Sequence, residues 1–162
     1  MSMINHSELD LKEESVIRIN RVAKVNSRGK RFSFSTIVVI GDGRTHVGIG
    51  AGKANEVLVS INKAKDTAKQ NLIKVPVYNY TIPHEIIGKH GASRVLLKPA
   101  PPGTGIIAGS AVRLIMEQVG ISNIYTKVLG SNNAMNVAKA VMNALLNLQD
   151  IRKVAKKRGK TP

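Results

Sequence analysis

The spacing of apolar residues in the first half of the chain limits its possible folds more than any other feature of the sequence. Residues 15–25 are rich in β-branched side chains and partly alternate, residues 32–40 alternate cleanly, and residues 46–49 continue the pattern. These segments predict three strands. In residues 55–72 the apolar spacing changes to three and four, which predicts a long helix. Three strands followed by a helix are the outline of a double-stranded-RNA-binding domain.

Two turns separate the predicted strands. Asp42-Gly43 supplies the positive φ that a tight hairpin turn needs. The other turn, residues 26–31, carries three positive charges at Arg28, Lys30 and Arg31. Charges on a short protruding loop suit contact with an RNA backbone, and the alternative is an ordinary solvated turn. The net charge of the chain favours the RNA interpretation.

The second half predicts strands and helices in a different order, so the fold class is α+β. Strands are expected at residues 73–79, 81–87, 94–98 and 121–129, and helices at 104–119 and 134–148. Pro76 and Pro83 mark the boundary between the halves. We therefore predict an acidic extension (1–14), in which residues 8–14 form a helical turn or fray, an N-terminal domain (15–78), a C-terminal domain (79–150) and a basic tail (151–162).

The charge balance identifies the expected partner. The chain of 162 residues has 25 Lys and Arg against 10 Asp and Glu, a net charge of +15. A folded domain this basic repels itself unless a polyanion offsets the charge, and nucleic-acid phosphate is the commonest one. An anionic membrane surface is the alternative, but no segment combines a basic amphipathic helix with bulky apolar anchors. Aromatic residues are only 3%, which excludes binding through many stacked bases.

Composition also excludes several other classes of protein. The chain has no cysteine, which removes disulfides, thiolate nucleophiles and cysteine metal sites. Its apolar runs are only a few residues long, and its first residues do not have the pattern of a signal peptide. We predict a cytoplasmic protein with no membrane association.

Two glycine-rich segments invite a nucleotide-binding interpretation, and both lack required residues. Residues 48–53 end in Gly-Lys, but Val47 stands where a phosphate-binding loop needs Gly, and Ala54 cannot hold magnesium. We predict a flexible corner there, with Lys53 able to contact one phosphate. Residues 103–108 have the spacing of a dinucleotide-binding turn, but no acid follows about 20 residues later to bind the ribose. We predict packing or partner contact there.

No group of residues in the sequence is arranged for catalysis. The four histidines have no metal-type spacing, no serine lies in a Gly-x-Ser-x-Gly motif, and no carboxylates are paired for acid–base chemistry. We predict no enzymatic activity, no cofactor, no metal and no small-molecule substrate.

The sequence resembles the bacterial small-subunit ribosomal protein S5 family. The resemblance is carried in the first half by Arg21-Val22-Ala23-Lys24-Val25, Arg31-Phe32-Ser33-Phe34, Val39-Ile40-Gly41-Asp42-Gly43 and Val47-Gly48-Ile49-Gly50-Ala51-Gly52-Lys53. In the second half it is carried by Ser93-Arg94-Val95-Leu96-Leu97-Lys98-Pro99, Gly103-Thr104-Gly105-Ile106-Ile107, Gly130-Ser131-Asn132-Asn133 and Ala155-Lys156-Lys157-Arg158. These motifs occur in the same order from about residue 16 to residue 160.

The resemblance implies a double-stranded-RNA-binding-like N-terminal domain followed by a C-terminal domain of the S5 second-domain type. It also implies a structural, rRNA-binding role in the small ribosomal subunit, near the decoding region and the mRNA entrance, with an influence on translational accuracy. Proteins of the S4 and S8 families are the implied neighbours. The alternatives are a free-standing regulator that binds double-stranded RNA and a nucleotide-binding enzyme that uses the loop at residues 103–108.

The candidate site residues form two groups. The candidate rRNA contacts are basic residues of the first half and of the tail, namely Arg21, Lys24, Arg28, Lys30, Arg31, Arg44, Lys53, Lys156, Lys157 and Arg158. The resemblance places the contact with the S4-type protein at Gly103, Thr104, Gly105 and Arg113. The tail is expected to order only against rRNA or the S8-type protein, because it offers little apolar material for packing.

Overall fold

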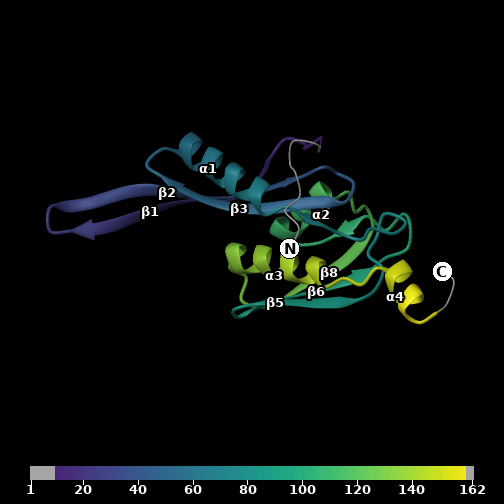
Figure 1. Cartoon of the computed structure of the whole chain (residues 1–162). Coiled ribbons are helices and arrows are strands. Elements are labelled where there is room, and N and C mark those ends of the chain that lie inside the picture. Colours follow the sequence, from purple (N-terminus) through teal and green to yellow (C-terminus); the bar gives the residue numbers. More distant parts are fainter. Residues whose placement is uncertain (1–9, 160–162) are drawn as a thin grey trace.

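The computed structural model describes residues 10–159 and arranges them in four layers (Figure 1). The first layer is one helix, α1 (Val57–Gln70). It covers an antiparallel sheet in the order β1-β2-β3-β4, made of β1 (Ser15–Asn26), β2 (Gly29–Gly41), β3 (His46–Ala54) and β4 (Ile73–Lys74).

The third layer consists of α2 (Ser110–Val119) and α3 (Ala134–Leu146), which lie between the two sheets. The second sheet has the order β5-β6-β8-β7, from β5 (Ile86–His90), β6 (Ser93–Pro99), β8 (Ile124–Gly130) and β7 (Ile106–Ile107). Only the β7–β8 pairing is parallel. A last helix, α4 (Ile151–Lys157), extends away from the layers (Figure 1). The predicted α+β class is therefore confirmed.

The three strands and the helix predicted for the first half are present. The side chains of Thr36, Val38 and Ile40 alternate onto the face that α1 covers, where they are buried against Ala64 and Ala68. The predicted strand at 32–40 begins three residues earlier, because the hairpin continues to Gly29.

The predicted flexible corner at residues 48–52 is wrong. These residues continue β3 to Ala54, paired throughout with β2. Gly48, Gly50 and Gly52 all face α1, and a Cβ built on any of them would strike the backbone of the helix. The glycines therefore allow α1 to pack directly on the strand instead of bending the chain.

Helix α2 begins six residues later than predicted. Gly103 and Gly105 have φ values of +90° and +78°, a left-handed conformation that no helix can contain. Residues 104–109 instead form an extended loop with the short strand β7. The strand predicted at 121–129 starts at Ile124, because Gly120 ends α2 in a left-handed conformation and the chain then turns.

The strands predicted at 73–79 and 81–87 are wrong over most of their length. Pairing with β3 ends at Lys74, a single bridge joins Tyr78 to Thr81, and β5 starts only at Ile86. Pro76 and Pro83 cannot donate ladder hydrogen bonds, and Asn79 and Tyr80 both have positive φ. The connection between the halves is thus irregular.

One hydrophobic core extends through both halves of the chain. Val39 and Val47 of the first sheet pack in the same buried cluster as Ile115 of α2 and Val141 of α3. Gln118 of α2 also donates from Nε2 to the carbonyl oxygen of Glu13 and the hydroxyl of Ser15. The two predicted domains therefore share an interface that is as buried as their interiors.

The chain ends were predicted less well. Residues 10–14 have no regular secondary structure, so they contain no helical turn, and the remainder of the proposed turn lies outside the described residues. Residues 151–157 form a helix without an added partner, capped by the Asp150 carboxylate, which accepts from the Arg152 N–H. The expectation of little internal packing is confirmed, because α4 has no buried residue.

Candidate nucleic-acid interface

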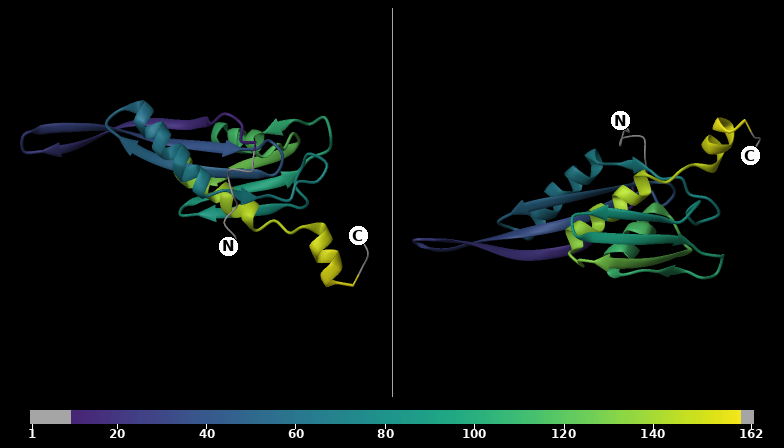
Figure 2. Two further views of the ribbon diagram at one scale, coloured as in Figure 1. Left: turned by 45° about the horizontal axis from the view of Figure 1, so that its top comes forward. Right: turned by 90° about the horizontal axis from the view of Figure 1, so that it is seen from below.

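Half of the β1–β2 hairpin extends beyond the rest of the molecule (Figures 1 and 2). Strand β3 pairs with β2 only from Gly41 to Phe34. Beyond that point residues 22–33 form a two-stranded ribbon, paired only with itself. A two-stranded hairpin is marginally stable in isolation, so this projecting ribbon is suited to docking against a surface that supports it.

The projecting ribbon and its base hold six of the ten predicted rRNA contacts. Five lie on the hairpin itself and are exposed, namely Arg21, Lys24, Arg28, Lys30 and Arg31. The sixth, Lys53, is exposed on β3 opposite Ser35, where the ribbon leaves the sheet. None of these six side chains pairs with a carboxylate of residues 10–159. Their charge is therefore available to an external anion.

The ribbon has two different faces. Lys24 and Arg31 lie directly opposite each other on one face, a like-charge pair that destabilises the free hairpin. On the other face the Arg21 guanidinium lies 4.1 Å from the centre of the Phe32 ring, which is 47% exposed. Arg21 is thus held in position by a cation–π contact while its donors stay accessible. This geometry suits phosphate contacts with apolar packing beside them.

Arg44 lies at the opposite end of the first sheet from the ribbon tip, in the β2–β3 turn. Asp42 Oδ1 accepts backbone N–H groups from Arg44, Thr45 and His46, each at 2.8 Å. Burial opposes ionisation of Asp42, but these bonds and the His46 ring outweigh it and lower the pKa to about 2. The turn is therefore rigid, and Arg44 forms a separate exposed cation.

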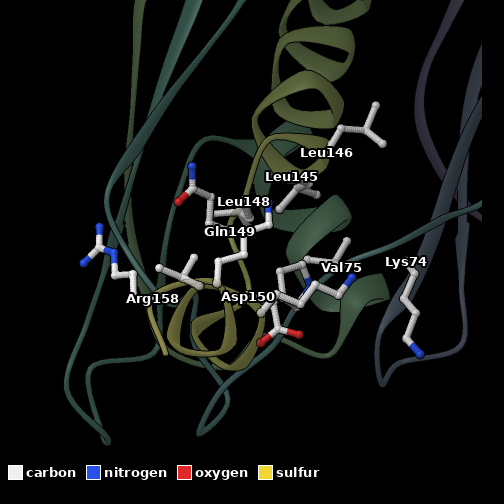
Figure 3. A pocket seen from close by; sticks show the side chains of 12 residues that line it. Lys74, Val75, Leu145, Leu146, Leu148, Gln149, Asp150 and Arg158 are labelled. Carbon is white, nitrogen blue, oxygen red and sulfur yellow. The ribbon is translucent and has the colours of Figure 1, made fainter. Parts of the chain in front are cut away.

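The three tail residues are far from the ribbon. Lys156, Lys157 and Arg158 are exposed at the end of α4, at the other end of the molecule (Figure 1). An open crevice separates α4 from the end of α3, with Lys74 and Arg158 on opposite sides of it (Figure 3). The predicted contacts therefore fall into three places rather than one patch.

The predicted protein-contact loop is shaped by a residue that the sequence analysis missed. The buried Asn123 side chain accepts, through Oδ1, the N–H groups of both Gly103 and Gly105 at 3.1 Å. Arg113 is exposed and donates from Nη2 to the carbonyl oxygen of Ile106 at 2.9 Å. Both glycine N–H groups are thus already used, which removes the donors that a dinucleotide-binding turn would offer to phosphate. Asn123 lies 20 residues after Gly103 and 18 after Gly105, so no local sequence pattern indicates this role.

Other kinds of site have little support in the structure. Among residues 10–159 no three His, Asp or Glu side chains gather as they would around a metal ion. No helix of this part of the chain is both long and apolar enough to cross a bilayer.

Comparison with known proteins gives matches over most of the chain. Residues 12–76 match the family model for the ribosomal protein S5 N-terminal domain, and residues 88–158 match the model for the S5 C-terminal domain. The chain is 52% identical over 159 residues to the small ribosomal subunit protein uS5 of Chloroflexus aurantiacus, covering 98% of this chain and 89% of that protein.

Two further relatives have the same name. The uS5 protein of Syntrophobacter fumaroxidans is 52% identical over 160 residues, which is 99% of this chain and 96% of that protein. That of Thermotoga maritima is 56% identical over 146 residues, covering 90% and 82%.

Proposed function

Because this chain belongs to the ribosomal protein S5 family, we propose that it is a structural constituent of the small ribosomal subunit and binds the rRNA of that subunit. The family is structural and non-enzymatic, and its members take part in translation as part of the ribosome. The observation that carries the proposal within the structure is the projecting ribbon, whose four exposed cations, with Arg21 at its base, have no carboxylate partner among residues 10–159.

We propose that the ribbon tip, Arg28, Lys30 and Arg31, is the main rRNA contact of the N-terminal half. A free-standing double-stranded-RNA-binding domain uses a flat, rigid surface to span successive grooves. Here four exposed cations lie on a thin two-stranded ribbon, residues 22–33, that is paired only with itself. This shape favours insertion between rRNA segments over binding along one duplex. Lys53 then contacts phosphate at the base of the ribbon.

We further propose that the loop at Gly103, Thr104 and Gly105, with Arg113, faces the S4-type neighbour, and that α4 faces rRNA or the S8-type neighbour. The loop is preshaped by Asn123 and exposes Gly103, so it loses little conformational entropy on docking. An interface of this kind near the decoding region and the mRNA entrance would influence translational accuracy, because its strength opposes rearrangement of the subunit during tRNA selection.

Sedimentation of a cell lysate on a sucrose gradient tests the proposed function. The chain is expected in the small-subunit and ribosome fractions, and a high-salt wash should release it. Persistence of most of the chain in the ribosome-free fractions would favour the free-standing regulator instead. Saturable micromolar binding of NAD or ATP to the pure protein would favour the nucleotide-binding enzyme.

A further inference from the structure

One face of the second sheet is not covered by any helix of residues 10–159. The helices α2 and α3 pack on its inner face, where Val95 and Leu97 are fully buried. Because side chains alternate along a strand, the intervening residues all lie on the opposite side. We call this side the outer face and define it by eight residues in cross-strand register: Ile87, Lys89, Arg94, Leu96, Lys98, Tyr125, Lys127 and Leu129.

The cations of the outer face form a continuous path across three strands. Lys89 of β5 lies directly opposite Arg94 of β6. Lys127 of β8 lies opposite Leu96, so it is diagonal to both Arg94 and Lys98. Direct cross-strand neighbours are about 5 Å apart at Cβ and diagonal neighbours about 7–8 Å. Neighbouring phosphates of a nucleic-acid strand lie at similar separations.

The cations of this path have no carboxylate partner among residues 10–159, and the nearest acid along these strands is the exposed Glu85, one residue before β5. The four strands of the sheet contain no Asp or Glu, and none of the four cations forms an ion pair within residues 10–159. Two cations placed directly opposite each other destabilise a free sheet. A polyanion bound to this surface offsets the repulsion between the opposed cations and stabilises the sheet.

The same face also exposes large apolar side chains. Ile87 is 58% exposed, Leu129 42% and Tyr125 39%. Tyr125 lies directly opposite Lys98, at the end of the cationic path. Several exposed large apolar side chains on one face of a sheet are typical of an interaction surface. A tyrosine beside a phosphate-binding lysine provides a surface on which one base can stack.

We infer that a strand of RNA crosses the outer face, with its phosphates along Lys89, Arg94, Lys127 and Lys98 and one base against Tyr125. The inference rests on the proposed function, since it takes rRNA as the polyanion, and it adds a second RNA-binding surface separate from the ribbon. We take RNA rather than an acidic protein as the occupant, because the four cations have no carboxylate partner among residues 10–159 and follow one another at spacings close to those of successive phosphates.

Photo-crosslinking identifies the occupant directly, and the absence of cysteine from the chain makes labelling specific. Ile87→Cys and Leu129→Cys each place one thiol on the outer face, and Gln70→Cys places one at the exposed end of α1. Each full-length variant is labelled with a short aryl azide, incorporated into small subunits and irradiated. We expect both outer-face labels to crosslink to an rRNA segment that the Gln70→Cys label does not reach.

Three results would overturn the inference while leaving the proposed function intact. These are crosslinks from the outer face to protein alone, no crosslink from a chain that is present in the subunit, and rRNA segments identical to those of the control. Failure of unlabelled chain to enter the subunit would instead overturn the proposed function, and this inference with it.

Charge removal gives an independent measurement. Arg94→Gln with Lys127→Gln removes two adjacent cations from the path, and Lys74→Gln with Lys139→Gln removes the same charge from exposed positions on β4 and α3. Since each lost phosphate contact lowers the salt dependence of binding by about 0.7–0.9 in the log–log slope, the first pair should lower it by about 1.4–1.8. The control pair should change it much less, and equal slopes for the two pairs would contradict the inference.

Discussion

Gly50→Ala tests whether the glycines of β3 exist for the close approach of α1. A Cβ at this position would lie 2.5 Å from the Ala68 backbone nitrogen and even closer to the Ala64 carbonyl oxygen. Both contacts are with helix backbone, so no side-chain rotation relieves them. Either α1 or β3 must move, and the buried contacts of Val38 and Ile40 with the helix are weakened.

The expected cost lies at the upper end of the range for overpacking, about 3 kcal/mol. That is a large fraction of the about 5–15 kcal/mol that stabilises a domain. For a chain of this length it corresponds to a fall in the thermal midpoint of about 6–12 °C. Differential scanning calorimetry or circular dichroism of the pure protein measures it.

Gly109→Ala is the matched control, since its Cβ would meet nothing within 4 Å and its φ of −67° suits any residue. It should shift the midpoint by much less than Gly50→Ala. A second comparison adds Ala64→Gly to Gly50→Ala. This change removes a side chain but leaves the clashing carbonyl, so it should restore nothing. Rescue by Ala64→Gly, or a Gly50→Ala midpoint that falls by less than about 2 °C, would refute the close-approach explanation.

Four further outcomes are expected. Replacing the three basic residues of the ribbon tip with Ala should lower the salt-dependence slope of rRNA binding by about 2–3, and an unchanged slope in a filter-binding titration would exclude the tip as the contact. Deleting residues 151–162 should leave the thermal midpoint nearly unchanged, because no residue of α4 is fully buried, while weakening assembly; a large fall in the midpoint would show that the tail belongs to the core. The pKa of Asp42 is lowered from 3.8 to about 2 on folding, so its ionised form adds stability that is complete above pH 4 and is lost as the pH falls toward 2. Asp42→Asn should therefore cost about 1–2 kcal/mol of unfolding free energy at neutral pH. It should also reduce the acid sensitivity of stability measured by denaturant titrations between pH 2 and pH 5. Arg113→Leu should raise stop-codon readthrough without loss of incorporation into subunits, and normal readthrough would contradict the proposed interface.

The fold was predictable where the signal is local. Alternation in residues 15–25 and 32–40 predicts β1 and β2, and helical spacing predicts α1 and α3. The glycines at 48–52 were predicted to form a bend, but their role depends on the helix that packs against them. The sequence alone does not distinguish a glycine at a bend from a glycine beneath a packed helix. The start of α2 was misplaced because the loop before it is held by Asn123, which is distant in sequence.

The candidate site was predictable in chemistry but not in arrangement. Charge and turn residues identify the cations of the ribbon, yet the length of the projection depends on where β3 stops pairing, which no pattern in β2 indicates. The outer face of the second sheet was visible in principle, since Arg94, Leu96 and Lys98 alternate with buried residues. The outer face can be recognised as one surface only from the register of the strands, which places Lys127 beside Arg94 and Lys98.

The projecting ribbon also bears on the protein before it joins any assembly. Strand β1 is an edge along its length, and beyond Phe34 the other edge of the hairpin is free as well. Free edges carry unpaired N–H and C=O groups on which a second chain can add a strand, the usual start of aggregation. Lysine and arginine on both strands oppose that pairing, because two such edges repel each other. The cations proposed to bind rRNA therefore also keep newly made copies of this chain apart until RNA neutralises them.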